Sequence, residues 1–346
     1  MSRRTTCVVV GGGPAGMIAG LLLARAGVEV TVLEKHADFL RDFRGDTVHP
    51  TTLELLDELG LIEQFNSLTH TKIHGLTLHG EQGPPVRVVN ISGLKVKYPY
   101  VAITPQWEFL NLLAEAGTDE PNFHLLMETE VTALICQNQK VVGVSYINAG
   151  IRQELKADLT IAADGRWSAL RRQAHLPMKS YNVPLDLWWF RLDTSEPVGE
   201  AILPISACHK LFIIIPRKGY AQIANIIRKG SDEFLRGQGL HPLRTAITRA
   251  LPVQSASAAV DLTWNEVKLL DIRLNRLTRW YRDGLLCIGD AAHAMSPVGG
   301  VGVNLAAQDG VAAARLLANP LLARNVATSD LAAVQHRRES AAIFMA

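Results

Sequence analysis

The chain has 346 residues, of which 48% are hydrophobic and 20% are charged. A chain of this length buries roughly 75% of its unfolded surface, so it can form a core without disulfides or metal ions. The composition excludes a disordered chain, a collagen-like repeat and a disulfide-stabilised miniprotein. At about 150 residues per domain, the length favours two domains.

The charges of the chain nearly balance. Lys and Arg number 35 against 33 Asp and Glu, a net charge of +2, so we do not expect nucleic acid as a partner. The four cysteines show no CxxC spacing: Cys7, Cys136, Cys208 and Cys287. We therefore expect free thiols, a reducing compartment such as the cytoplasm, and no metal site.

The amino terminus resembles a signal peptide at first sight. Ser2-Arg3-Arg4 precedes the apolar stretch Val8 to Ala24, as in a secretory or twin-arginine leader. Adjacent glycines and Pro14 interrupt that stretch, and Arg25 ends it short of the ~20 apolar residues that span a membrane. We therefore interpret this region as part of the fold and expect no membrane association.

A β-α-β unit follows. Cys7 to Val10 predicts a buried strand, Pro14 to Ala26 a helix, and Val28 to Leu33 a second strand. The first turn carries Gly11-x-Gly13-x-x-Gly16, the pattern that brings a pyrophosphate against a helix N-terminus, and Glu34 is placed to bind ribose hydroxyls. This arrangement predicts a dinucleotide site; the alternative is a glycine turn followed by a surface glutamate.

The middle of the chain has a different texture. Residues 71–104 and 185–228 contain alternating or continuous apolar runs that predict an inserted, mainly antiparallel sheet. The predicted strands are Gly75 to Leu78, Val86 to Val89, Leu185 to Leu192, Leu211 to Arg217 and Tyr220 to Arg228.

Two further strands end in turns. Leu159 to Ala163 precedes Asp164-Gly165, and Leu285 to Ile288 precedes Gly289-Asp290. A glycine loop, Pro297-x-Gly299-Gly300-x-Gly302-x-Asn304, then opens a helix over Leu305 to Leu317. A second glycine loop is expected if the protein holds one extended cofactor at both ends, and a flavin dinucleotide is such a cofactor.

In this interpretation Asp290 accepts a hydrogen bond from a polyol hydroxyl. The amides around Gly302 and Val303, at a helix start, face the N1–C2=O2 edge of the flavin, which becomes anionic on reduction. The alternative for Asp290 is a simple helix cap.

These ordered motifs resemble the class A FAD-dependent aromatic monooxygenases of the para-hydroxybenzoate hydroxylase type. The resemblance implies an α/β fold: a Rossmann-like FAD-binding domain (GR2-type) with an inserted, mainly antiparallel substrate domain. We expect the FAD domain in residues 1–70, 105–177 and 278–330, and the substrate domain in 71–104 and 178–277. Residues 331–346 are expected as a helical tail, which either ends there or is truncated.

The resemblance also assigns roles. Arg44, in the loop Arg41 to Thr47, would contact the pyrophosphate and line the channel in which the flavin moves. Asp164 would serve both FAD and NADPH. The predicted cofactor-binding set, with the motif residues above, is Gly11, Gly13, Pro14, Ala15, Gly16, Glu34, Lys35, Arg44, Gln106, Val131, Asp164, Asp290, Pro297, Gly302, Val303 and Asn304. Gln106 would reach the pyrophosphate and ribityl portion, and Val131 the adenine through its backbone. On residue type alone, Arg44 could equally be an exposed loop charge and Gln106 an ordinary helix start.

No catalytic side chain can be named from the residues. By the resemblance, Pro297, Gly299 and Gly300 would border the flavin face where oxygen reacts. Candidate substrate contacts on the inserted sheet are Trp188, Phe190, Arg191, Phe212 and Tyr220, although such aromatic stripes more often form core. Strand periodicity places Trp188 and Phe190 on one face, with Trp189 and Arg191 on the other. We expect His293 to pack under its loop.

The resemblance therefore predicts an NADPH- or NADH-dependent hydroxylase that uses O₂, through a flavin C4a-hydroperoxide, on a small aromatic or similar substrate. Lys35, His36 and Arg41 favour NADPH through its 2′-phosphate, unless they are simply solvated charges. Alternatives are a flavin dehydrogenase or reductase that does not use O₂, or a flavin-binding protein without turnover. A halogenase is not favoured because the chain lacks a Trp-x-Trp-x-Ile-Pro segment. We expect a monomer or homodimer.

Overall fold

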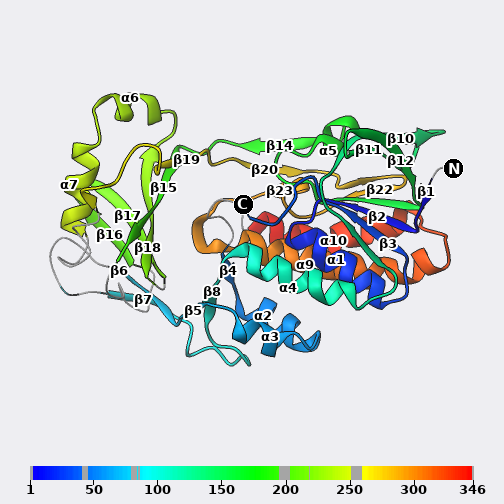
Figure 1. Ribbon diagram of the computed structural model, residues 1–346, viewed down its shortest axis with the longest axis horizontal. Coiled ribbons are helices and arrows are strands. Elements are labelled where there is room, and N and C mark those ends of the chain that lie inside the picture. The colour runs from blue at the N-terminus through cyan, green and yellow to red at the C-terminus, as the bar shows by residue number, and fades with distance from the viewer. Residues whose placement is uncertain are drawn as a thin grey trace.

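The computed structural model describes residues 3–40, 46–78, 84, 86–194, 203–217, 219–250 and 259–344. Figure 1 shows a larger lobe built around a parallel sheet and a smaller, mainly β lobe, joined by several extended strands. Among the described residues, no helix combines the length and apolarity needed to cross a membrane.

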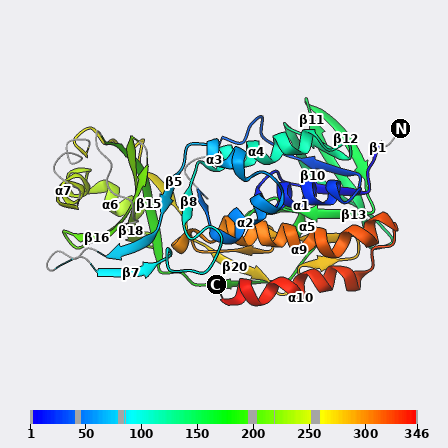
Figure 2. The same cartoon turned by 90° about the horizontal axis from the view of Figure 1, so that it is seen from below.

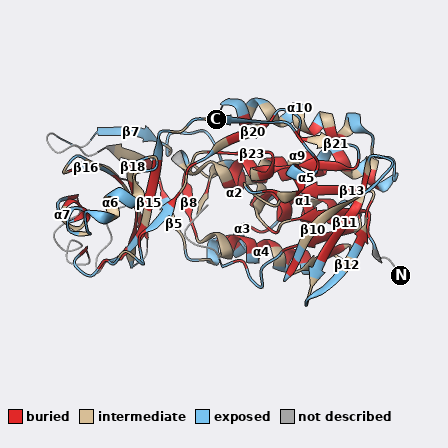
Figure 3. Ribbon diagram, turned by 90° about the horizontal axis from the view of Figure 1, so that it is seen from above, coloured by how far each residue is buried: buried red, intermediate tan, exposed pale blue. Residues whose placement is uncertain are grey.

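The larger lobe centres on a six-stranded sheet of order β21-β22-β13-β2-β3-β9. Its five parallel strands are β2 (Cys7–Val10), β3 (Val30–Leu33), β9 (Phe123–Leu126), β13 (Leu159–Ala162) and β22 (Leu285–Cys287), with β21 (Tyr281–Arg282) antiparallel at the edge. Strands β2, β3, β13 and β22 are buried along their whole length, which explains their continuous apolar sequences (Figure 3). The Rossmann-like prediction is confirmed.

Helices cover one face of this sheet. Figure 2 shows α4 (Gln106–Thr118), α1 (Pro14–Arg25), α9 (Gly302–Leu322) and α10 (Thr328–Phe344) side by side in that order. Gly310 of α9 lets this helix pack closely against α1, because a Cβ at Gly310 would come within 2.7 Å of the Ala15 carbonyl oxygen. Shorter helices are α2 (Pro50–Glu58), α3 (Ile62–Ser67) and α5 (Ala169–Gln173).

The opposite face is covered by a sheet that the sequence analysis did not predict. Its order is β1-β12-β11-β10, from β1 (Arg3–Arg4), β10 (Thr129–Gln137), β11 (Lys140–Asn148) and β12 (Ile151–Lys156). Val141, Val144 and Tyr146 of β11 join the same core as the parallel strands. Cys7 and Cys287 also lie in this core, where burial raises the pKa of both thiols.

The smaller lobe is an antiparallel sheet of order β16-β17-β18-β15-β19, which confirms the predicted inserted sheet. Its strands are β15 (Leu185–Asp193), β16 (Leu203–Ala207), β17 (Lys210–Arg217), β18 (Tyr220–Arg228) and β19 (Lys268–Leu270). Helices α6 (Asp232–Gly237) and α7 (His241–Ala250) lie on its outer side, away from the larger lobe (Figure 1).

Three small sheets lie beside or between the lobes. They comprise β4 (Thr47–Val48), β5 (Thr71–Ile73) and β8 (Val101–Ile103); β6 (Gly75–Leu78) with β7 (Val86–Asn90); and β14 (Met178–Tyr181), β20 (Leu274–Leu277) and β23 (His293–Ala294).

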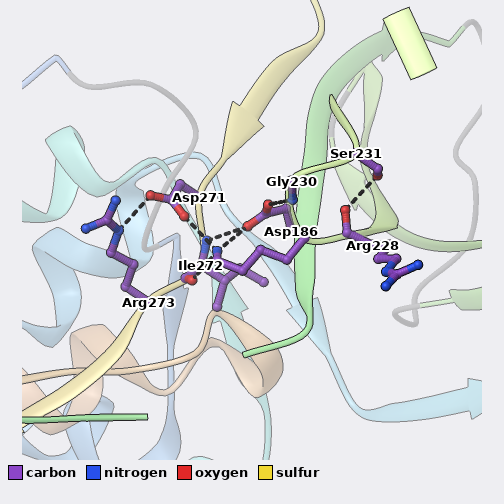
Figure 4. Close-up of polar contacts among 8 residues, drawn as sticks. Asp186, Arg228, Gly230, Ser231, Asp271, Ile272 and Arg273 are labelled. Atoms are coloured by element: carbon purple, nitrogen blue, oxygen red, sulfur yellow. Dashed lines mark hydrogen bonds and ion pairs between the residues drawn. The ribbon is translucent and has the colours of Figure 1, made fainter. Parts of the chain in front are cut away.

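A cluster of ion pairs stabilises the chain segments that connect the two lobes. Lys229 Nζ donates to Asp186 Oδ1 and Asp271 Oδ1, each at 2.7 Å, and to the Ile272 carbonyl at 2.8 Å (Figure 4). Asp186 is buried and also accepts the amides of Gly230 and Ile272. Asp186 is the second residue of β15, whereas Lys229 directly follows β18 and Asp271 directly follows β19, so the cluster joins the ends of three strands of the small sheet.

Candidate active site

The three predicted motifs follow neighbouring strands of the parallel sheet. Ala162 at the end of β13 pairs with Val10 of β2 on one side and with Cys287 of β22 on the other. Adjacent strands lie about 4.8 Å apart, so the loops after β2 and β22 begin about 10 Å from one another. Ligands of open α/β sheets bind at this carboxyl edge.

The first glycine loop has the shape that its sequence predicts. Gly11 has φ +105°, and a Cβ there would overlap the Ala163 carbonyl oxygen. A Cβ on Gly16 would overlap the Gly11 carbonyl oxygen. By contrast, a Cβ on Gly13 would meet nothing within 4 Å, and no side chain caps α1. Open space therefore lies over the free amides of the first helical turn, where an anion binds best.

Glu34 lies against this loop. Its Oε2 accepts the Gly12 amide at 2.8 Å, and its Oε1 accepts the His36 amide at 3.1 Å and contacts the His36 ring. Burial would raise the pKa of Glu34, but these hydrogen bonds outweigh it and lower the pKa. The carboxylate is therefore ionised at neutral pH and keeps the acceptor character that ribose hydroxyls need.

Asp164 follows β13, and its Oδ2 accepts the amides of Ala169 and Leu170 at the start of α5. Its Oδ1 is buried and has no hydrogen-bond partner among the described residues. Burial raises the pKa of this carboxyl group. A buried acceptor without a donor is costly, so this atom is expected to receive a donor from a bound molecule or water.

Asp290 is the middle residue of the short helix η2 (Gly289–Ala291), whose N-cap is Ile288, so Asp290 does not occupy the N-cap position. Its Oδ2 accepts a hydrogen bond from Arg166 Nη2 at 3.3 Å. Arg171 is buried and donates to the carbonyls of Asp290 and Ala291. Two arginines of the segment after β13 thus hold the Gly289-Asp290 turn in place.

The second glycine loop precedes α9. Gly299 and Gly300, in η3 (Val298–Gly300), have φ of +78° and +60°. A Cβ on Gly300 would overlap the Thr47 side chain, whereas a Cβ on Gly302 would meet nothing within 4 Å. Helix α9 has no side-chain cap, so its first-turn amides are also open to a ligand.

Comparison with known proteins identifies this arrangement. The sequence profile of a family described as an FAD binding domain matches residues 4–342, nearly the whole chain. The chain belongs to this FAD-binding family. The flavoprotein is 31% identical to 6-methylpretetramide 4-monooxygenase of Streptomyces rimosus, over 96% of this chain and 80% of that protein.

Solved structures share the fold. PqsL of P. aeruginosa, in complex with 2-aminobenzoylacetate, superposes with a TM-score of 0.83 at 23% identity, covering 99% of this chain and 94% of that one. The myxobacterial chondrochloren halogenase CndH superposes with a TM-score of 0.82 at 18% identity, covering 97% of this chain and 79% of that one. At these identities the likeness concerns the fold alone, and that fold serves both oxygenation and halogenation.

The residues present fit an FAD molecule. The flavoprotein places two uncapped helix starts, α1 and α9, on one side of its sheet, with open space over Gly13 and Gly302. Asp164, with its unpartnered Oδ1, follows β13 between β2 and β22, and the ionised Glu34 follows β3 on the other side of β2. These groups suit phosphates, ribose, ribityl hydroxyls and a ring edge that becomes anionic. Among the described residues, no group of three or more His, Cys, Asp or Glu could hold a metal ion.

The side chain of Asn304 has a structural role that was not predicted. Its Oδ1 accepts the His49 amide and the Thr52 hydroxyl, each at 2.8 Å, and its Nδ2 donates to the carbonyls of Thr47 and Gly300. The side-chain amide is thus fully used within the protein. It fixes the second glycine loop to β4 and α2, which leaves only its backbone N–H for the cofactor.

The remaining cofactor contacts stay predictions. Arg41 and Arg44 lie outside the described residues. Lys35 is exposed, Val131 is half-buried on β10, and Gln106 is the first residue of α4. The Gln106 backbone N–H donates to the Asp46 carboxylate. Pro297 immediately precedes η3.

The expected substrate contacts need correction. Trp188, Phe190 and Phe212 are buried in the core between the small sheet and α7, on the side away from the FAD lobe. Their aromatic pattern reflects packing, so a substrate does not reach them. Arg191 and Tyr220 lie on the opposite face, where the guanidinium stacks 4.2 Å from the ring.

A buried ion pair that was not predicted lies at the interface of the lobes. Arg217, the last residue of β17, donates to Asp46 and also to Gln222 Oε1 at 2.8 Å. Burial lowers the pKa of Arg217 and raises that of Asp46, so both charges are costly unless paired. Arg217 Nη1 is buried without a partner among the described residues. Only the fold brings the two residues together.

His293 packs under its loop, as predicted. Its Nε2 lies 2.6 Å from Asp309 Oδ2, and its ring lies 4.9 Å from that of Trp280. Asp309 is fully buried on α9 and also accepts the Gly289 amide and Arg338 Nε of α10. Burial would lower the pKa of His293, but the Asp309 charge raises it.

Proposed function

We propose that this flavoprotein monooxygenase hydroxylates a small aromatic or similarly electron-rich molecule, using NAD(P)H and O₂. The observation that carries the proposal is that two glycine loops lead into uncapped helix starts, at α1 and α9, and that the second loop carries the glycines Gly299 and Gly300. Glycines there leave room for a planar ring and for oxygen. The S. rimosus relative is named as a 4-monooxygenase of 6-methylpretetramide, which agrees with oxygenation of an organic substrate.

Each element of the site has a task. The amides of α1 bind the pyrophosphate, Glu34 binds the ribose, and Asp290 binds the ribityl chain. The first turn of α9 stabilises negative charge on the ring. When bound, FAD supplies the redox chemistry: it accepts hydride and activates O₂. The protein contributes orientation and exclusion of water.

The substrate approaches the inner face of the small sheet. Arg217 and Trp189 lie on this face, and each has a side-chain N–H donor without a partner among the described residues. The same face carries the apolar side chains of Ile213 and Ala224. Such a surface suits an aromatic body that bears a carbonyl, carboxylate or phenolate oxygen.

The finer assignments are part of the same proposal. The exposed Lys35 and His36 beside Glu34 favour NADPH over NADH, and comparison of KM for the two in K35A tests this. We retain the predicted division into FAD-binding and substrate-binding segments, a cytoplasmic location, and a monomer or homodimer.

The decisive experiment follows substrate-stimulated NAD(P)H oxidation by FAD-loaded protein, with mass detection of a product that has gained one oxygen atom. The reaction is run with O₂, without O₂, and with added halide. Equal product without O₂ assigns a dehydrogenase, and a halogenated product assigns a halogenase. If NAD(P)H does not bleach the bound FAD under anaerobic conditions with any substrate tested, the proposal that NAD(P)H is the reductant is refuted.

A further inference from the structure

Residues 46–49 lie between the two halves of the site. Asp46 binds Arg217 of the small sheet, and Thr47, at the start of β4, donates its hydroxyl to the Gly300 carbonyl at 2.6 Å. His49 contacts the same loop, because its ring donates to the Gly299 carbonyl. Consecutive residues therefore reach the substrate sheet on one side and the flavin-face loop on the other.

These contacts determine how the loop's peptide groups point. The Gly300 carbonyl is held from the β4 side by Thr47 Oγ1 and by Asn304 Nδ2, at 2.6 and 3.2 Å. In a trans peptide the carbonyl and the following N–H point in opposite directions. The Val301 N–H is therefore turned away from β4, while the Gly300 N–H is used by the Pro297 carbonyl. Gly300 is so close to Thr47 that a Cβ would not fit.

We propose that Thr47 is a positioning residue for the flavin: it orients the Gly300–Val301 peptide so that its N–H, with the first-turn amides of α9, stabilises the reduced, anionic ring. The Arg217–Asp46 pair holds Thr47 in place, which makes the flavin environment depend on the substrate sheet. This inference rests on the proposed position of the flavin at this loop.

The readout is the midpoint potential of bound FAD, measured by equilibration with a reference dye during slow reduction. T47V removes the hydroxyl at nearly constant volume, and T47S retains it. We expect T47V to shift the equilibrium about tenfold toward oxidised FAD, equivalent to about 30 mV for a two-electron couple, and T47S to restore it. The matched control is T51V: Thr51 is exposed on α2, and its hydroxyl accepts a hydrogen bond from Gln308 Nε2 at 3.4 Å.

The coupling to the substrate sheet is tested with D46N. This variant should shift the potential in the same direction as T47V, and D46N/T47V should shift it no further than T47V alone. A potential equal to that of the wild type in FAD-loaded T47V overturns the inference. If T47V does not retain FAD, the potentials of T47S and D46N are compared instead. If both equal the wild-type potential, the inference is overturned. A wild-type protein that binds FAD but hydroxylates nothing counts against the proposed function only.

Discussion

The buried charges beneath the Gly289-Asp290 turn allow a quantitative test of the fold. Asp309 is fully buried and accepts three donors: the Gly289 amide at 3.0 Å, His293 Nε2 at 2.6 Å and Arg338 Nε at 2.8 Å. D309N preserves the shape of the side chain but leaves two cations without their anion. Breaking such a buried pair costs about 3–5 kcal/mol. At about 2–4 °C per kcal/mol, the Tm should fall by roughly 6–20 °C.

The effect should depend on pH. Asp309 raises the pKa of His293, so this contribution is present below the unfolded value of about 6.5 and is lost as pH rises through the raised value. Burial opposes ionisation of Asp309, but its cationic partners prevail and lower its pKa. That contribution is present above the unfolded value of about 3.9 and is lost as pH falls through the lowered value. The difference between wild type and D309N should therefore be largest at mildly acidic pH.

Urea denaturation of the FAD-saturated protein across this range measures the difference. The matched control is D283N, since Asp283 forms an exposed pair with Lys140 at 3.5 Å and should cost less than about 1 kcal/mol. A D309N penalty as small as that of D283N, or one that is constant between about pH 5 and pH 10, would refute the reasoning.

The other predictions concern the cofactor site and the interface of the lobes. D290A should weaken FAD binding by about 1.5–3 kcal/mol, measured by titration of the apoprotein, because a charge-assisted hydrogen bond is lost; unchanged affinity contradicts its role. G13V should leave the Tm of the apoprotein nearly unchanged but abolish FAD binding, because Gly13 has φ −76° and open space at its Cβ. R217L should lower the free energy of unfolding, measured by urea denaturation, by about 3–5 kcal/mol, and D46L/R217L should recover most of this loss. If the losses of the two single substitutions simply add in the double variant, the two residues do not form a coupled pair.

Local patterns predicted the FAD-binding half of the fold well. The apolar run Cys7–Val10, the glycines that follow it and the helix from Pro14 each have a local physical requirement, and all three are confirmed. Three strands of the small sheet, β15, β17 and β18, were also predicted, because alternation and β-branched residues are local signals, whereas the shorter β16 and β19 were not. The sheet β10–β12 was missed, since its strands mix buried and exposed residues without a clean period.

Side-chain roles were harder to predict than elements. Strand periodicity correctly separated Trp188 and Phe190 from Trp189 and Arg191, but it could not say which face meets the FAD lobe. That choice depends on α7, which covers the first pair, and α7 lies far from β15 in the sequence. The hydrogen bonds of the Asn304 side chain were not predicted for a similar reason: its partners in residues 47–52 are visible only in three dimensions.

The sequence by itself determined the two glycine loops, each between a strand and a helix, and predicted from them one extended cofactor. It could do so because a close approach of backbone and phosphate excludes a Cβ at specific positions, and that requirement is local. Only the tertiary structure decided that Asp46 meets Arg217, that Thr47 holds Gly300, and that α10 reaches Asp309 through Arg338. These contacts join residues far apart in the chain, so their energies depend on burial and distance, which no local pattern encodes.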